Sequence, residues 1–295
     1  MSSQNLLFII NPISGGGKKQ KKLPLLIEKQ LDSSTFKATL YHTKKAGDGK
    51  KRSLLALAEK KWDAVIVVGG DGSLHEVASI FKDTHIPVGI IPCGSGNGLA
   101  YSLGIPSDMA LALEKITRFQ VRTIDYLEIN GLPCFNIGGI GFEAIISKAF
   151  NEGSTKRGLG QYINAIWKLW KKYQGFDYQI LTKTGKTSNR RAYSLAFANS
   201  NQYGNRFYIN PQSSLSDGFF ECCHIPKLKI YQYLKLAQHC FRKKNSPYVQ
   251  ISQHQELRIH CLQPQDAHID GDIRILGEKD FHLKIQPGGL NVLSV

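Results

Sequence analysis

Short apolar runs alternate with segments of helical periodicity over roughly the first 125 residues. The predicted strands are Leu6–Ile10, Lys37–Tyr41, Ala64–Val68 and Pro87–Ile91. The predicted helices are Lys19–Gln30, Lys50–Lys60, Leu74–Lys82 and Met109–Ile116. This alternation is typical of βα units built on a parallel sheet. Ala64–Val68 is apolar throughout, which indicates a central strand covered by helices on both faces.

After Asp125 the pattern changes to β-rich runs separated by turn dipeptides such as Asn130-Gly131 and Asp217-Gly218. The candidate strands are Thr123–Ile129, Cys134–Gly138, Tyr178–Leu181, Tyr193–Asn199, Phe219–Ile225, Leu257–His260 and Phe281–Ile285. One helix, Gln161–Tyr173, is predicted among them. We therefore predict an α/β domain over residues 1–125 and an antiparallel β domain over residues 126–286. Residues 287–295 are candidates for packing back on the first domain.

Composition excludes several classes of protein. Of the 295 residues, 42% are hydrophobic and 21% are charged, unlike a disordered chain. No apolar run approaches the roughly 20 residues that a membrane-spanning helix needs. The opening run Leu6–Ile10 is shorter than a signal peptide's and lacks a basic segment before it, so we expect a cytoplasmic chain. The six cysteines form no C-x-x-C pair and are predicted to be reduced structural thiols.

The charge balance indicates a polyanionic partner. There are 38 Lys and Arg residues against 23 Asp and Glu, a net charge of +15. Nucleic acid, an anionic membrane surface and phosphorylated substrates would each be attracted. Because no known nucleic-acid-binding module is recognisable, nucleic acid is not the expected partner.

Three glycine-rich segments each follow a predicted strand. Gly69–Ser73 follows the central strand, and Asn11–Lys18 and Pro92–Gly98 follow two others. Glycine lets the backbone approach a polyphosphate, and N–H groups at a following helix start favour an anion. Since ligands bind outside the carboxyl ends of strands in open α/β sheets, the three segments predict one phosphate site. None has the spacing of a Walker A or Rossmann motif.

Four segments resemble motifs of the diacylglycerol-kinase-type lipid kinases, a family that includes bacterial lipid kinases, sphingosine kinases and ceramide kinases. They are the N-P-x-S-G opening Asn11–Gly15, the GGDG loop Gly69–Ser73, the P-x-G-S-G-N loop Pro92–Asn97 and the late D-G-D segment Ile269–Asp272. The resemblance implies an NAD-kinase-like α/β nucleotide-binding half and a β-sandwich lipid-binding half. It also implies ATP and Mg²⁺, and transfer of the γ-phosphate to the hydroxyl of diacylglycerol or a sphingoid-type lipid.

The same resemblance assigns roles by position. Asp270 is implied as the general base that takes the proton from the lipid hydroxyl, with Asp71 ranked second for that role. Asp71 also resembles the carboxylate of the ATP–magnesium site. The remaining implied nucleotide contacts are Asn11, Thr43, Gly69, Gly70, Gly72, Ser73 and Ser95. The alternative for Asp270-Gly271 is an ordinary hairpin turn.

A later segment resembles a structural magnesium site of the family, in which Asp217 and the carbonyl groups of Ser214 and Phe219 hold the ion. A tight Asp217-Gly218 turn without metal is the alternative. Mg²⁺ usually keeps several water ligands, so the spacing of residues in the sequence does not by itself show that this loop binds the ion. Two positions depart from the family pattern. Ser73 stands in place of Thr and keeps the hydroxyl group, whereas Asp272 stands in place of Glu and shortens the carboxylate.

The expected partners are ATP, a lipid alcohol and, transiently, an anionic membrane surface. The last of these would make the protein a peripheral membrane protein. Trp167 and Trp170 on the predicted helix Gln161–Tyr173 suit a membrane interface, but packing on the β domain accounts for the same stripe.

Two other functions stay open: an NAD kinase, which shares the GGDG loop, and a catalytically silent lipid- or nucleotide-binding regulator. The sequence does not decide the acceptor lipid, or whether two copies form a homodimer.

Overall fold

The computed structural model describes residues 3–17, 20–151, 168–181 and 187–294. The chain divides into two compact units. Unit 1 comprises Met1–Tyr126, Gln202–Asn205 and Pro287–Val295. Unit 2 comprises Leu127–Asn201 and Arg206–Gln286.

Unit 1 is built on a parallel sheet with the strand order β2-β1-β3-β4. Its strands are β1 (Gln4–Ile10), β2 (Phe36–His42), β3 (Ala64–Gly69) and β4 (Val88–Pro92), and the last residues of β14 (Asp272–Leu293) join β4 in parallel. Every residue of β3 is buried, as expected for a strand covered on both faces. The four strands predicted from the sequence in this half are therefore confirmed.

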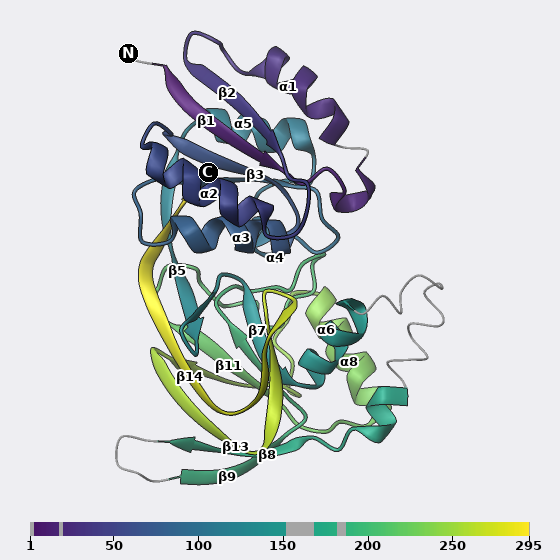
Figure 1. Ribbon diagram of the computed structural model, residues 1–295. Helices are drawn as coiled ribbons and strands as arrows, with labels where there is room; N and C mark the ends of the chain where they lie inside the picture. The colour runs from purple at the N-terminus through teal and green to yellow at the C-terminus, as the bar shows by residue number, and fades with distance from the viewer. Residues whose placement is uncertain (1–2, 18–19, 152–167, 182–186, 295) are drawn as a thin grey trace. The chain divides into compact units, whose positions relative to one another are not determined.

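The helices of unit 1 lie between its strands along the chain. They are α1 (Leu23–Gln30), α2 (Asp48–Glu59), α3 (Asp71–Phe81), α4 (Gly98–Ser102) and α5 (Met109–Thr117). Short 3₁₀ turns η1 (Ser14–Gly16) and η2 (Gln20–Lys22) precede α1. Helix α2 packs on α3, and α1 packs on α5. Figure 1 shows α2 and α3 in front of the sheet and α5 behind it.

The strand order places a switch point in this sheet. The chain passes from β1 outward to β2 and then returns past β1 to β3. Because βα crossovers are right-handed, the helices after β1 and β3 lie on opposite faces of the sheet. The loops that follow β1 and β3 therefore diverge at the carboxyl ends of neighbouring strands, which is where open α/β sheets bind ligands.

Unit 2 is dominated by antiparallel pairing, with β12, β11, β10, β7, β13 and β14 adjacent in that order. The strands are β6 (Leu132–Cys134), β7 (Ile137–Gly141), β8 (Phe176–Leu181), β9 (Thr187–Ala192), β10 (Ser194–Ala198), β11 (Phe220–Ile225), β12 (Gln250–His254) and β13 (Glu256–Ile269). Strand β5 (Val121–Ile129) crosses the boundary between the units. The predicted combination of a parallel α/β half and a β-rich half is confirmed.

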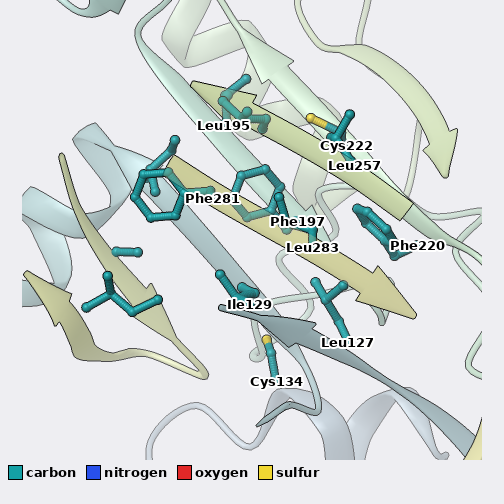
Figure 2. Close-up of a cluster of buried hydrophobic side chains, with 14 of the residues drawn as sticks. Leu127, Ile129, Cys134, Leu195, Phe197, Phe220, Cys222, Leu257, Phe281 and Leu283 are labelled. Carbon is teal, nitrogen blue, oxygen red and sulfur yellow. The ribbon is translucent and has the colours of Figure 1, made fainter. Parts of the chain in front are cut away.

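The core of unit 2 is formed by side chains from strands that are far apart in the sequence. Figure 2 shows Leu127 and Ile129 of β5 with Phe197 of β10 and Leu283 of β14 in one buried cluster. Phe197 and Leu283 are fully buried. Burying side chains of this size stabilises a fold by about 1.5–3 kcal/mol each, so this cluster holds the non-local strand pairs together.

Unit 2 also contains helices that the sequence pattern did not predict. They are α6 (Phe142–Asn151) and α8 (Ile230–Phe241). Their apolar positions are spaced for a helix, but they stand between strand-like runs and were interpreted as part of a β-rich region. Of the predicted helix Gln161–Tyr173, residues 161–167 lie outside the described residues, and residues 168–172 are helical.

Candidate nucleotide and acceptor sites

The glycine-rich loops after β1 and β3 are joined by a side chain. The amide Nδ2 of Asn11 donates to Ser73 Oγ at 3.0 Å, and the backbone N–H of Asn11 donates to the carbonyl oxygen of Val68 at 2.9 Å. Thr43 lies beside the same strand end, because its N–H and Oγ1 donate to the carbonyl oxygen of Ile10 at 2.9 and 3.3 Å. Asn11, Thr43 and Ser73 therefore gather at the carboxyl ends of β1, β2 and β3.

The loops after β3 and β4 touch through their backbones. The N–H of Cys93 donates to the carbonyl oxygen of Gly69 at 2.8 Å. A Cβ atom on Gly94 would lie 2.5 Å from Gly70 Cα, closer than real Cβ atoms approach a backbone atom. A Cβ on Gly15 would lie 2.0 Å from the carbonyl oxygen of Cys93. Glycine is required here because the three loops pack against one another, in addition to any approach by a ligand.

Asp71 connects the second loop to the third. Its Oδ2 accepts the N–H of Asn97 at 2.7 Å, and its Oδ1 accepts the N–H of Gly98 at 2.9 Å. Gly98 opens α4, so the carboxylate caps the start of that helix. Asp71 is itself the first residue of α3. One side chain thus fixes the loop that carries Ser95.

The start of α3 presents backbone donors. The first hydrogen bond of the helix runs from the N–H of Leu74 to the carbonyl oxygen of Gly70. The N–H groups of residues 71–73 precede it and are directed along the helix axis, which is the arrangement that binds phosphate at helix N-termini. Gly70, Gly72 and Ser73 are therefore placed as a phosphate-binding turn requires.

Two contributors to this site were not among the predicted site residues. Asn97 is 5% exposed and adopts a left-handed conformation, and its side chain bonds both the N–H and the carbonyl oxygen of Gly94. The segment Gln202–Asn205 belongs to unit 1 although it comes much later in the chain. Gly204 pairs with Asn97, and the side chain of Asn205 donates to the carbonyl oxygen of Ser95. Its polar, glycine-containing sequence marks a loop but gives no indication of this contact.

Asp270 lies in unit 2, in the two-residue turn that joins β13 to β14. Ile269 pairs with Asp272, and both Asp270 and Gly271 have positive φ angles of 52° and 91°. That is the conformation of a type I′ hairpin, for which Asp-Gly is a favoured sequence. The structure therefore gives Asp270 the hairpin turn that the sequence offered as its alternative role.

The carboxylate of Asp270 is also oriented by a second segment. Oδ1 accepts the N–H of Asn136 at 2.8 Å, and Oδ2 accepts the N–H of Phe135 at 3.1 Å. Asp270 is 9% exposed. Cys134 Sγ lies 3.4 Å from Oδ1, and burial, followed by the Asp270 charge, raises the pKa of the Cys134 thiol well above its usual value. A carboxylate held this firmly by backbone donors is fixed in direction, as a catalytic base requires.

An acid–histidine pair joins His268, which shortly precedes Asp270 on β13, to Glu143 of helix α6. His268 Nε2 lies 3.3 Å from Glu143 Oε2, and their side chains are 3% and 16% exposed. A Cβ on Gly139 would lie 2.4 Å from that glutamate oxygen, so glycine leaves room for the pair. Neither residue was among the predicted site residues.

The predicted magnesium loop forms a turn in unit 2. Asp217 Oδ1 accepts the N–H of Phe219 at 3.1 Å, and Oδ2 accepts from Gln253 at 3.4 Å. Burial, and to a smaller extent the Asp217 charge, raises the pKa of the nearby Glu221 carboxyl group. The hydrogen bond from Ser213 lowers this pKa, but the net effect is an increase.

Within the described ranges, no group of three or more His, Cys, Asp or Glu side chains gathers to hold a metal ion. A Mg²⁺ ion at the Asp217 loop would therefore rest on one carboxylate, on carbonyl groups such as those of Ser214 and Phe219, and on water. Mg²⁺ accepts such a ligand set, so the residues fit the ion. Across the same ranges, none of the helices has the length and apolar content needed to cross a membrane.

Comparison with known proteins agrees with both units. The family model of the diacylglycerol kinase catalytic domain matches residues 5–129. The model of the YegS C-terminal NAD kinase beta sandwich-like domain matches residues 137–294. Together the two models account for nearly all of the chain.

Relatives of known name extend this similarity. The diacylglycerol kinase of Bacillus subtilis (strain 168) is 25% identical over 273 residues, which are 90% of this chain and 88% of that protein. The diacylglycerol kinase of Mycobacterium tuberculosis (strain ATCC 25618 / H37Rv) is 25% identical over 229 residues, 75% of this chain and 74% of that protein. A crystal structure of a diacylglycerol kinase from Bacillus anthracis str. Sterne superposes with a TM-score of 0.75 at 20% identity, covering 100% of this chain and 98% of the other. That likeness shows the shared fold.

Proposed function

Because this chain belongs to the diacylglycerol-kinase-type lipid kinase family, we propose that it transfers the γ-phosphoryl group of ATP to the hydroxyl group of a membrane lipid. The observation that carries the proposal is the meeting of the three glycine-rich loops at the carboxyl ends of β1, β3 and β4. Asp71 bridges two of these loops. This is a phosphate-binding arrangement in the unit matched by the kinase catalytic domain.

Binding and charge stabilisation are the tasks of the unit 1 residues. Asn11, Thr43, Gly69, Gly70, Gly72, Ser73 and Ser95 line the nucleotide in this proposal. Phosphoryl transfer depends on positioning and on stabilising charge on the transferring group, which backbone N–H donors at a helix start provide. A Mg²⁺ ion carried with ATP would lie toward Asp71 and neutralise phosphate charge.

Asp270 is the proposed base. Its carboxylate accepts the proton of the lipid hydroxyl while the hydroxyl oxygen attacks the γ-phosphorus. The bond from that phosphorus to the β–γ bridging oxygen breaks, and ADP leaves with the bond's electron pair. The N–H groups of Phe135 and Asn136 keep the carboxylate in one orientation. The acceptor class is diacylglycerol or a sphingoid-type lipid.

A transfer assay tests the reaction and the base together. Purified protein is incubated with γ-labelled ATP and Mg²⁺ against micellar diacylglycerol, sphingosine and ceramide, and separately against soluble NAD. Labelled lipid should form with the wild type and fall by about 100-fold or more with Asp270→Asn, since general-base catalysis contributes roughly 10²–10⁴-fold. Circular dichroism of the variant checks that the hairpin still folds, because Asn also tolerates the left-handed conformation.

The other arms of the assay decide between functions. An NAD kinase is the second candidate, because the model matching residues 137–294 is NAD kinase beta sandwich-like. Label on NAD and on no lipid would assign that function instead. Magnesium-dependent ATP binding without transfer to any acceptor would contradict the kinase proposal. It would support a catalytically silent regulator instead.

The Asp217 loop is the proposed structural magnesium site, with the carbonyl groups of Ser214 and Phe219. Mg²⁺ should raise the Tm of the wild-type protein without nucleotide, because an ion that binds only the folded state stabilises it. Asp217→Asn should remove this increase. An equal increase in both proteins would place the ion elsewhere. Asp280→Asn is the matched control, since Asp280 is an exposed aspartate of the same unit that pairs with His260.

A further inference from the structure

Helix α8 is held in unit 2 by one of its faces. Leu236 and Cys240 on that face are 7% and 1% exposed. The ring of Tyr233 lies 6.0 Å from the ring of Trp170 and 5.9 Å from that of Tyr193. An amphipathic helix of a globular protein normally has its apolar residues on the face that packs against the core and polar residues on the outward face.

The outward face of α8 is apolar as well. Ile230, Leu234 and Phe241 are 44%, 68% and 61% exposed. Positions i, i+4 and i+11 fall within about 40° of one another around a helix of 3.6 residues per turn. These three residues form the α8 stripe. Tyr231 beside it is 50% exposed. Contiguous exposed apolar residues of this kind mark an interaction surface.

The residues around the stripe are basic. The basic rim consists of Lys227, Lys229, Lys235, Arg242, Lys243 and Lys244, all of them exposed. No Asp or Glu occurs between Lys227 and Asn245. Lys235 Nζ lies 5.9 Å from the centre of the Tyr231 ring, and Lys243 Nζ lies 5.3 Å from that of Tyr208. The rim would attract an anionic partner, whereas a second copy of this face would bring two basic rims together and be repelled.

We propose that the α8 stripe and its basic rim dock on an anionic lipid bilayer. The rim contacts lipid headgroups, and the stripe enters the boundary with the acyl chains, as in helices that lie in a membrane interface. Tyr231, with an apolar ring and a polar hydroxyl, suits that boundary. The inference rests on the proposed function, because a lipid acceptor would be dissolved in the bilayer that the helix contacts.

Vesicle binding by the full chain tests the surface without requiring catalysis. The protein is sedimented with vesicles of phosphatidylcholine alone and of phosphatidylcholine mixed with phosphatidylglycerol. Wild type should bind the mixed vesicles, and high salt should weaken binding. Leu234→Gln should weaken it about tenfold or more, because it withdraws a whole buried leucine from the interface. Lys243→Gln combined with Lys244→Gln should also weaken it about tenfold or more.

Leu276→Gln is the matched control, since Leu276 on β14 is 67% exposed, almost the same as Leu234 at 68%. Tm values of all variants confirm folding. Absence of wild-type binding, or equal losses from the two leucine variants, would overturn the proposal. It would also be overturned if Leu234→Gln converted a dimer to a monomer without weakening vesicle binding. That outcome would assign the stripe to a second copy.

A transfer assay with a short-chain, water-dissolved acceptor separates this inference from the proposed function. Leu234→Gln should keep wild-type turnover on that acceptor and lose it on vesicles. Vesicle binding without turnover on any acceptor would remove the kinase proposal while leaving the docking surface in place. Turnover on the short-chain acceptor without vesicle binding would remove the docking surface and leave the kinase proposal in place.

Discussion

At the scale of single residues, Asp71 is the clearest case of a side chain with two tasks. It caps α4 through the N–H groups of Asn97 and Gly98, and it is the proposed carboxylate beside the nucleotide. Asp71→Ala should lower the free energy of unfolding by about 1–2 kcal/mol through loss of the cap. It should also lower phosphate transfer by about 100-fold or more, because loop geometry and charge are lost together.

Asp108 provides a matched control for Asp71. Its Oδ1 caps α5 by accepting the N–H groups of Ala110 and Leu111 at 2.9 and 3.0 Å, and Asp108 is not among the proposed nucleotide contacts. Asp108→Ala should cause a similar loss of stability in urea titrations and leave turnover unchanged. If the two variants lost activity equally, the effect of Asp71 would be one of stability alone.

Gly94 carries the second prediction at this scale. In Gly94→Ala the new Cβ would meet Gly70 Cα at 2.5 Å, so the loops after β3 and β4 must separate. ATP affinity, measured by calorimetry, should fall about tenfold or more. Gly49→Ala is the control: its Cβ would approach only the flexible end of Glu76, at 2.8 Å, and the position lies in helix α2. Unchanged affinity in Gly94→Ala would show that the contact between the loops does not shape the site.

At the scale of elements, the sequence was sufficient to predict those features that depend only on residues close together in the chain. The strands of unit 1 have continuous or alternating apolar patterns, and glycine-rich turns follow three of them, so both the sheet and the convergence of its loops could be predicted. The Asp270-Gly271 hairpin could likewise be anticipated from its two residues.

The remaining features depend on packing between distant segments. The Asp71 carboxylate reaches N–H groups 26 and 27 positions away, and Asp270 reaches Phe135 and Asn136 across more than 130 positions. The segment Gln202–Asn205 joins unit 1 from the far half of the chain. Helix α8 was missed although its apolar positions are spaced for a helix, because it stands between strand-like runs in a β-rich part of the sequence.

Glu221, on strand β11, gives a pH prediction. Burial raises the pKa of Glu221 above its ordinary value of 4.5. The folded state therefore binds the proton more tightly than the unfolded state, and stability from this group is present at low pH. It is lost as the pH rises from 4.5 through the folded-state pKa.

Glu221→Gln cannot ionise, so it should not show this loss. In buffer with a chelator, the Tm of Glu221→Gln relative to wild type should increase between pH 4.5 and pH 7.5. Scanning calorimetry at several pH values measures the difference. Glu114→Gln, an exposed position on α5, is the control and should follow wild type. A constant difference across the range would mean that Glu221 titrates normally.

At the scale of the whole molecule, the six cysteines report on opening of each unit. All six are free and buried. Cys93 lies in unit 1 and the other five lie in unit 2. Burial raises the pKa of Cys222, Cys240 and Cys261 to about 12, which leaves little thiolate at neutral pH. Modification by a thiol reagent therefore requires local or global opening.

Nucleotide should protect these thiols unequally if ATP binds the loops of unit 1. Cys93 follows β4, and its carbonyl oxygen contacts the Gly15 turn, so opening that exposes Cys93 disrupts the site. Binding at ten times Kd lowers such opening about 11-fold, since the factor is one plus the ratio of ligand to Kd. Mass spectrometry of the modified protein, with and without ATP and Mg²⁺, should show slowing at Cys93 and unchanged rates at the other five positions. Equal slowing at all six positions would show that the two units open as one. No slowing at Cys93 would show that the nucleotide does not bind at this loop.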